Sequence, residues 1–121
     1  MYKRQLPAPR EERDAGGRTT AYIGPSGITQ ADHLLFVANF NANSVSVYDL
    51  RLGAFGELVY EIRNVGENPH ALSVSPDGSL LVVANMIGEV RRDVVSSTLT
   101  LIDLDPVSPT YLQIVGWIVN Q

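Results

Sequence analysis

Two patterns of apolar and polar residues recur along the chain in the same order. A nearly continuous apolar run at Leu34–Asn39 returns 46 residues later at positions 80–85. A run that alternates small polar with apolar residues, 44–50, returns 54 residues later at positions 98–104. Continuous apolar runs are typical of strands covered on both faces, and alternation is typical of a pleated strand with one buried face. The chain therefore contains a repeated unit built from strands.

Each repeated unit predicts four short strands. We expect them over residues 27–29, 34–39, 44–50 and 57–63 in the first unit, and over 71–75, 80–85, 97–104 and 111–119 in the second. The turn at 75–78 has Pro at its second position and Gly at its end, as tight turns prefer. No segment has helical apolar spacing over a useful length. All-β units of four strands and about 40–45 residues predict antiparallel β-propeller blades.

The two units differ in two places. The second carries eight additional residues between its second and third strands, so we expect residues 87–96 to form a long loop. In the first unit, residues 29–33 replace the Ser-Pro-Asp-Gly turn of the second. We expect His33 to be a turn residue.

Composition excludes several classes of protein. The chain has 121 residues, of which 45% are hydrophobic and 18% charged, so disorder is not its main state. It has no Cys, which excludes disulfides, thiolate metal sites and Cys nucleophiles. No apolar run approaches the roughly 18–20 residues of a transmembrane helix, so we expect no membrane span.

Charge is distributed unevenly. Residues 1–18 contain five of the nine Lys and Arg residues, and the remaining residues contain four Arg, no Lys and ten acids. This acidic body offers no basic surface for nucleic acid. Residues 1–18 have no apolar period and no signal-peptide core, so they predict a disordered leader. Residues 1–5 match the translation of a transposon end used in sequencing libraries, which predicts an adapter scar.

The expected organisation is a leader at 1–18, one blade at 19–66 and a second blade at 67–121, truncated before the next blade. Propellers typically have about 4 to 8 blades, so two blades cannot close a ring. We expect the chain to be a fragment whose partners are the remaining blades of the same protein. The alternative is a short protein that self-associates into a ring.

Four motifs identify a family resemblance. They are Phe-Val-Ala-Asn at 36–39, Asn-Ser-Val-Ser-Val-Tyr-Asp at 43–49, Gly-Glu-Asn-Pro-His-Ala at 66–71 and Ser-Pro-Asp-Gly at 75–78. Together they resemble the YVTN-type β-propeller repeat, which is related in style to lactonase propellers of the 6-phosphogluconolactonase kind. The resemblance covers residues 24–119. It implies a larger propeller, such as a seven-bladed one, in a bacterial or archaeal protein that is periplasmic, secreted or at the cell surface.

The candidate site residues cluster around the start of the second unit. His70 and Glu67 are the candidates for catalysis, since either could activate water, and His titrates near neutral pH. The alternative for His70 is a turn residue whose ring bonds a neighbouring backbone group. The candidates for ligand binding, which the resemblance implies would share one face of the propeller, are Asn68, Asn85, Glu89, Arg91 and Arg92. Asn39 and Asn85 end equivalent strands, and the favoured interpretation of both is structural, with the carboxamide satisfying backbone groups of the turn. The two Arg could hold a carboxylate or phosphate, or the loop could simply be solvated.

No cofactor or metal is expected. Asp49 and Asp103 end equivalent strands, but one acid per blade is too few for the 6 to 8 oxygen ligands of Ca²⁺. No zinc spacing and no nucleophile motif occurs. The sequence therefore favours a binding or interaction module that contacts a small molecule or a protein at the channel face. The alternative is a lactonase-type hydrolase that acts on a sugar-acid lactone.

Overall fold

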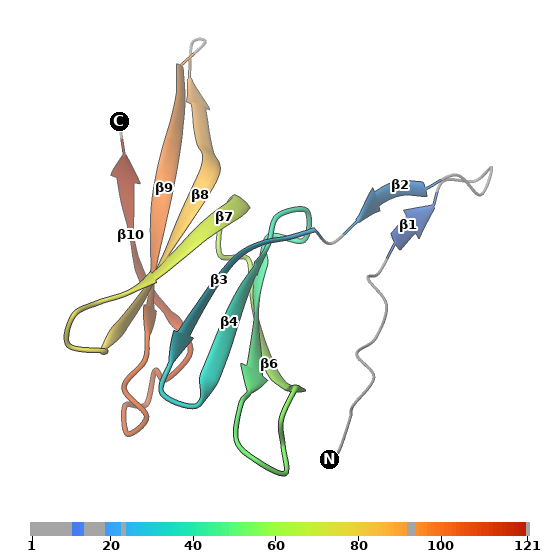
Figure 1. Ribbon diagram of the computed structural model, residues 1–121. Coiled ribbons are helices and arrows are strands. Elements are labelled where there is room, and N and C mark those ends of the chain that lie inside the picture. Colours follow the sequence, from blue (N-terminus) through green and yellow to red (C-terminus); the bar gives the residue numbers. More distant parts are fainter. Residues whose placement is uncertain (1–10, 14–18, 23, 92–93, 121) are drawn as a thin grey trace.

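Two four-stranded antiparallel sheets make up most of the protein (Figure 1). The computed structural model describes the backbone of residues 11–13, 19–22, 24–91 and 94–120, and the side chains of 24–86 and 97–119. Blade 1 contains β3 (Pro25–Ala31), β4 (Leu34–Asn39), β5 (Ser44–Asp49) and β6 (Glu57–Arg63). Blade 2 contains β7 (Glu67–Val74), β8 (Leu80–Arg91), β9 (Val94–Asp103) and β10 (Ile114–Asn120). The predicted all-β fold of two four-stranded propeller-type blades is confirmed.

A separate two-stranded sheet precedes blade 1. It pairs β1 (Glu11–Arg13) with β2 (Thr19–Tyr22). The sequence predicted a disordered leader over 1–18, whereas β1 is a short strand inside that segment. The remaining leader residues, including the predicted adapter scar at 1–5, lie outside the described residues. Within the described part of the chain, no helix is long and apolar enough to cross a membrane.

The prediction of a long loop at residues 87–96 is wrong. Residues 87–91 and 94–96 instead lengthen β8 and β9 into a hairpin that rises beyond the rest of blade 2 (Figure 1), in which Glu89 pairs with Ser96 and Arg91 with Val94. Pairing satisfies backbone groups that a loop would leave to water, and β-branched residues favour it. Elsewhere β3 and β7 are longer than predicted, and β10 begins at Ile114 rather than at 111.

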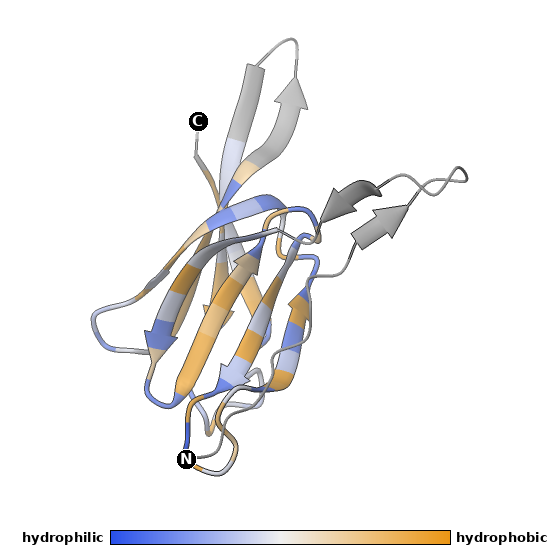
Figure 2. Ribbon diagram, turned by 45° about the vertical axis from the view of Figure 1, so that its right-hand side comes forward, coloured by the Kyte–Doolittle hydropathy of each residue, from blue (hydrophilic) through white to orange (hydrophobic). Residues whose placement is uncertain are grey.

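The hydrophobic core lies between the two blades. Each blade has two faces, and we call one of them the front face. In blade 1 the front face carries the buried residues Leu34, Phe36, Ala38, Val45 and Val47. The back face is the opposite side, which in blade 2 carries the fully buried residues Leu81, Val83, Asn85, Thr100 and Ile102. The front face of blade 1 packs on the back face of blade 2. Apolar residues accordingly concentrate in the strands and polar residues in the turns (Figure 2).

The inner strands β3 and β7 lie directly against each other. A Cβ on Gly27 would lie 2.7 Å from the backbone oxygen of His70, so only glycine permits this approach of the two backbones. The contact brings the starts of both strands to one end of the molecule. We call this end the His70 end, and the opposite end the Asp49 end.

Candidate binding surface at the His70 end

His70 is placed on the surface by a β-bulge. The register between β7 and β8 shifts between Pro69 and Ala71, so that His70 is the additional residue. The equivalent shift in β3 lies between Pro25 and Gly27, which confirms that the two strand starts are repeats. Bulges redirect a side chain. The His70 side chain is accordingly exposed, while Pro69 is buried.

Hydrogen bonds between the blades fix the backbone around His70. The backbone N–H of Asn68 donates to Oδ1 of Asn43 at 3.0 Å. Nδ2 of Asn68 donates to the backbone oxygen of Phe40 at 3.1 Å. On the other side, Oγ of Ser26 donates to the backbone oxygen of Pro69 at 2.9 Å. The start of β7 is therefore tied to blade 1, and the Asn68 carboxamide, a candidate for ligand binding, already bonds the backbone.

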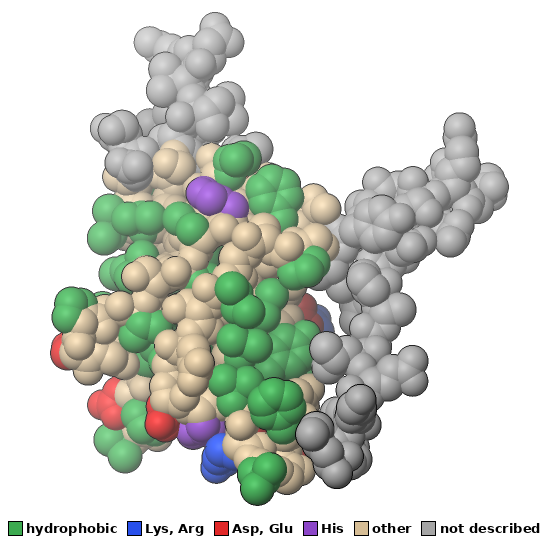
Figure 3. All heavy atoms as spheres, viewed as in Figure 1, with side chains coloured by type: hydrophobic (Ala, Val, Ile, Leu, Met, Phe, Trp, Pro, Cys, Tyr) green, Lys and Arg blue, Asp and Glu red, His purple; other side chains and the backbone are tan. Residues whose placement is uncertain are grey.

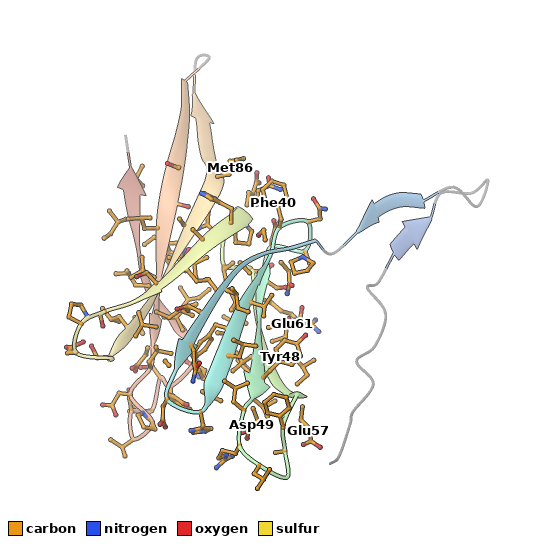
Figure 4. The ribbon with its side chains drawn as sticks, viewed as in Figure 1. Phe40, Tyr48, Asp49, Glu57, Glu61 and Met86 are labelled. Atoms are coloured by element: carbon orange, nitrogen blue, oxygen red, sulfur yellow. The ribbon has the colours of Figure 1, made fainter. Side chains whose placement is uncertain are left out.

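Two apolar side chains lie at the His70 end. Met86 is 52% exposed at the end of the regular part of β8, and Phe40 is half-buried in the β4–β5 turn. Figure 4 shows both at the same end of the molecule, and Figure 3 shows a histidine among hydrophobic side chains there. Glu67, the second catalytic candidate, is exposed near the start of the same strand. In the described part of the chain, neither Glu67 nor His70 makes a side-chain hydrogen bond or ion pair.

Phe40 and Met86 were missed by sequence reasoning. They occupy equivalent positions, since each directly follows the repeated Asn that ends its strand. An apolar residue immediately after a strand-ending Asn in both copies was the available signal. This signal is weak, because a single apolar residue next to an apolar strand is indistinguishable in sequence from a residue of that strand.

The side chain of Asn85 links strands inside the protein, in line with the structural interpretation of a strand-ending Asn. Its side chain is fully buried. Nδ2 donates to Oγ1 of Thr98 at 3.0 Å and to Oγ1 of Thr100 at 2.8 Å, and also approaches the backbone oxygen of Val65 at 3.4 Å. The Thr100 hydroxyl donates to the same Val65 oxygen. The amide thus joins two strands of blade 2 to the end of blade 1.

Two of the remaining candidates lie on the hairpin formed by β8 and β9. Glu89 and Arg91 lie on its first strand, two and four residues beyond the pair Glu67–Ile87, so the hairpin extends from the His70 end. That these residues meet Glu67, Asn68 and His70 stays a prediction, because the side chains of Glu89 and Arg91 lie outside the described residues. Arg92 lies outside the described residues.

The Asp49 end is held by carboxylates that bond within the protein. Asp49 is buried and accepts hydrogen bonds from Nη2 of Arg51 at 2.7 Å and from its backbone N–H at 2.8 Å. These bonds lower the pKa of Asp49 from 3.8 to about 2. The equivalent Asp103 accepts from Thr110 at 2.6 Å, and hydrogen bonds from Ser108, Thr110 and Asp105 lower its pKa. Among the described residues, no cluster of His, Asp or Glu could hold a metal ion.

A cavity of about 450 Å³ also opens at the Asp49 end, between the turns of the two blades. Its lining is mostly apolar, and its polar members include Asp32, His33 and Tyr111. The predicted turn position of His33 is confirmed, since His33 lies between β3 and β4. Its Nδ1 lies 2.8 Å from Oδ2 of Asp32. Burial together with the charge of Asp32 raises the pKa of Tyr111.

Comparison with known proteins supports the fold. No family model and no curated protein matches the chain. Hydrazine synthase of Kuenenia stuttgartiensis is 26% identical, with a TM-score of 0.58 over 81% of this chain and 24% of that one. A functionally unknown protein of Desulfotomaculum acetoxidans is 16% identical, with a TM-score of 0.61 over 96% of this chain and 36% of that one. The chain thus spans about a quarter to a third of the proteins it resembles, and the likeness is that of a β-propeller-like all-β fold.

Proposed function

We propose that this chain is part of a YVTN-type β-propeller that acts as a binding module, and that its ligand or partner binds at the His70 end. One observation carries the proposal: a bulge exposes the imidazole of His70 on a strand of blade 2 that bonds of Asn68 and Ser26 tie to blade 1. A binding group held on rigid strands loses little conformational entropy when it captures a ligand.

The chemistry of this end fits a ligand with an apolar face and a hydrogen-bonding edge. Met86 and Phe40 provide the apolar contact, and the ring nitrogens of His70 can donate and accept. The exposed carboxylate of Glu67 adds an acceptor for hydroxyl groups. Sugar acids and their lactones, the class that the YVTN and lactonase resemblance suggests, have such hydroxyl-rich edges.

A lactonase-type hydrolase is the second candidate. It is favoured by the exposure of His70 and Glu67 on one strand, three residues apart, since a hydrolase needs a group that activates water. A general base is usually oriented by another side chain. Binding needs no such partner, so the present arrangement supports the module more strongly than the enzyme.

One experiment separates the two. The chain, labelled with ¹⁵N, is titrated with gluconate and with glucono-1,5-lactone while amide shifts and lactone hydrolysis are recorded. Binding should shift amides at 40–43 and 67–71 and leave 75–79 unchanged, and His70→Gln should abolish the shifts. The matched control is His33→Gln at the Asp49 end. If the chain hydrolyses the lactone faster than buffer does, and His70→Gln abolishes this activity, the hydrolase is supported in place of the binding module. Shifts centred on the Asp49 cavity, or no shifts with either probe, would count against the proposed surface.

A further inference from the structure

The cavity at the Asp49 end is formed by turns of both blades. Its volume of about 450 Å³ lies within the range of small-molecule sites. Blade 1 contributes the turn between β3 and β4, and blade 2 contributes the turn between β7 and β8 and the loop between β9 and β10 (Figure 1). The apolar walls include Leu34, Phe36 and Leu104, which belong to the buried core. The cavity therefore opens directly onto the contact between the blades.

Backbone hydrogen bonds hold the turns around this cavity in place. The N–H of Leu50 donates to the oxygen of His33 at 2.7 Å, within blade 1. The N–H of Leu104 donates to the oxygen of Ser79 at 2.9 Å, which joins the two turns of blade 2. A ligand that enters the cavity therefore meets walls that are already ordered, and this lowers the entropy cost of binding.

Asp32 gives the cavity an exposed carboxylate. It lines the cavity, and its side chain is 90% exposed. Its Oδ2 lies 2.8 Å from Nδ1 of His33, a second lining residue, which holds the carboxylate in one orientation. Among the described residues, Oδ1 of Asp32 has no hydrogen-bond partner. One oxygen of the carboxylate is therefore available to a ligand.

The second repeat shows that the turn does not require an acid at this position. The residue 46 positions after Asp32 is Gly78, and both have a left-handed backbone, with φ of +53° and +76°. Glycine adopts this conformation without a steric penalty, whereas a side chain adds strain. Blade 1 thus places a charged side chain beside the cavity in a backbone conformation that favours glycine. Strain at such a position is a reason to look for a ligand.

Tyr111 brings an aromatic ring to the same cavity from blade 2. It lies in the loop between β9 and β10 and lines the cavity with Asp32. Burial and the charge of Asp32 raise the pKa of Tyr111, so the phenol and the carboxylate are close enough to interact. The face of an aromatic ring attracts positive charge. A ring beside a carboxylate is therefore suited to a cation.

The charges around the cavity also favour a cation. Among its described lining residues there is no Lys or Arg. The charge of Asp32 also reaches Arg51, but Nη2 of Arg51 lies 2.7 Å from Oδ2 of Asp49, with which it pairs. The chain after residue 18 contains four Arg, no Lys and ten acids, so its field attracts cations and repels anions.

We propose that this cavity binds a small organic ammonium ion. The ammonium group lies between the carboxylate of Asp32 and the ring of Tyr111, and the apolar group of the ligand packs against Leu34, Phe36 and Leu104. The proposal does not rest on the proposed function, whose ligand is a sugar acid or its lactone at the opposite end of the molecule.

The test uses 2-phenylethylammonium as the probe, at neutral pH, with the ¹⁵N-labelled chain. Binding should shift the amides at 31–34, 78–79 and 111–112 and leave those at 67–71 unchanged. Two probes with the same ring serve as ligand controls: 2-phenylethanol is neutral and phenylacetate is an anion. Both should bind about tenfold more weakly or worse, because neither forms a charge-assisted bond with Asp32. Equal binding of 2-phenylethanol, or no shifts at about 10 mM ammonium, where a millimolar Kd would be nearly saturated, overturns the proposal.

Two substitutions of Asp32 separate binding from folding. Asp32→Gly installs the residue that the second repeat has at this position, so it should keep the wild-type free energy of unfolding in urea. Asp32→Asn keeps the shape of the side chain and tolerates the left-handed backbone. Both should weaken binding of the ammonium probe about tenfold, to the level of 2-phenylethanol. Binding that survives both substitutions overturns the proposal.

The matched control for charge is Glu61→Gln. It removes one negative charge from a residue outside the cavity lining, where Glu61 forms an exposed pair with Arg63. This variant should bind the ammonium probe as the wild type does. If Glu61→Gln weakens binding as much as Asp32→Asn does, the probe responds to the net charge of the chain and the proposal is wrong.

A pair of variants tests the aromatic ring. Tyr111→Phe keeps the ring and should bind the ammonium probe within about twofold of the wild type, whereas Tyr111→Leu removes the ring and should bind more weakly. Tyr111 packs against the core, so circular dichroism first checks that both variants fold. If Tyr111→Leu does not fold, the Asp32 variants decide the outcome. Unchanged binding by a folded Tyr111→Leu would overturn the proposed place of the ammonium group.

Discussion

The side chain of Asn85 occupies the space that a side chain on Gly66 would need. A Cβ on Gly66 would lie 2.3 Å from Nδ2 of Asn85, and Gly66 has a φ of +151°. The link between the blades therefore passes directly over the amide that joins Thr98 and Thr100 to Val65. Packing of blade 2 on blade 1 depends on this glycine and this amide together.

Replacing Gly66 should weaken the protein more than replacing a glycine in open space. Gly66→Ala forces the buried carboxamide of Asn85 away from its partners and adds backbone strain, so we expect a loss of about 2–4 kcal/mol in the free energy of unfolding. Gly53→Ala is the control, because Gly53 has a φ of +92° but nothing within 4 Å of its missing Cβ. Urea unfolding of both variants measures the difference. Equal losses would contradict the packing argument.

The two equivalent asparagines should differ in their contribution to stability. Asn85→Ala leaves the buried Thr100 hydroxyl and the Val65 carbonyl without the amide, which costs about 1–3 kcal/mol. Asn39→Ala removes bonds only within blade 1 and should cost less. The same unfolding measurement compares the two. A larger loss for Asn39→Ala would show that the bond to the preceding blade is not the important one.

The approach of β3 to β7 should tolerate no side chain. Gly27→Ala brings a Cβ within 2.7 Å of the His70 backbone oxygen, which cannot move aside as the end of a side chain can. We expect a loss of about 2 kcal/mol or more, together with shifted amide resonances at 67–71. Gly116→Ala is the control, because the atom nearest to its added Cβ lies 3.8 Å away in the flexible side chain of Leu101. This variant should keep the stability of the wild type and its amide resonances at 67–71. An unaltered Gly27→Ala spectrum would refute the close contact.

Acid should weaken the Asp49 end through loss of the pair between Asp49 and Arg51. The folded-state pKa of Asp49 is about 2, below its ordinary value of 3.8, mainly because its carboxylate accepts hydrogen bonds from Arg51. The stabilisation by the ionised carboxylate is therefore fully present above about pH 4 and is lost as the pH falls towards 2. Arg51→Ala removes the main cause of the lowered pKa, so stability should fall less steeply across this window than in the wild type.

The control for the acid experiment is Arg63→Ala. Arg63 forms an exposed pair with Glu61 at 3.9 Å, and such pairs contribute little. The free energy of unfolding of Arg63→Ala should therefore depend on pH between pH 4 and 2 as that of the wild type does. The pairing argument fails if Arg51→Ala and Arg63→Ala show the same slope.

The regular strands could be predicted from the sequence because their causes are local. The alternation of Ser44–Asp49 and the apolar run of Leu34–Asn39 specify strands, and their return at fixed spacing specifies two sheets. The strand extensions at 87–91 and 94–96 were missed because an insertion has no counterpart in the first repeat. The bond from Asn85 to the backbone oxygen of Val65 could not be predicted from local pattern, because Val65 lies twenty residues away in the other repeat.

Local pattern was enough to determine that the chain is all-β, that it repeats, and where most strands lie, since strand alternation and turn chemistry act over a few residues. Only the packing of one blade on the other determined which faces are covered, that Asn85 is an interior group, and that Phe40 and Met86 lie at the same end of the molecule. The physical reason is that the two faces of each sheet carry similar apolar residues. Which of them is buried depends on the neighbouring blade rather than on the strand itself.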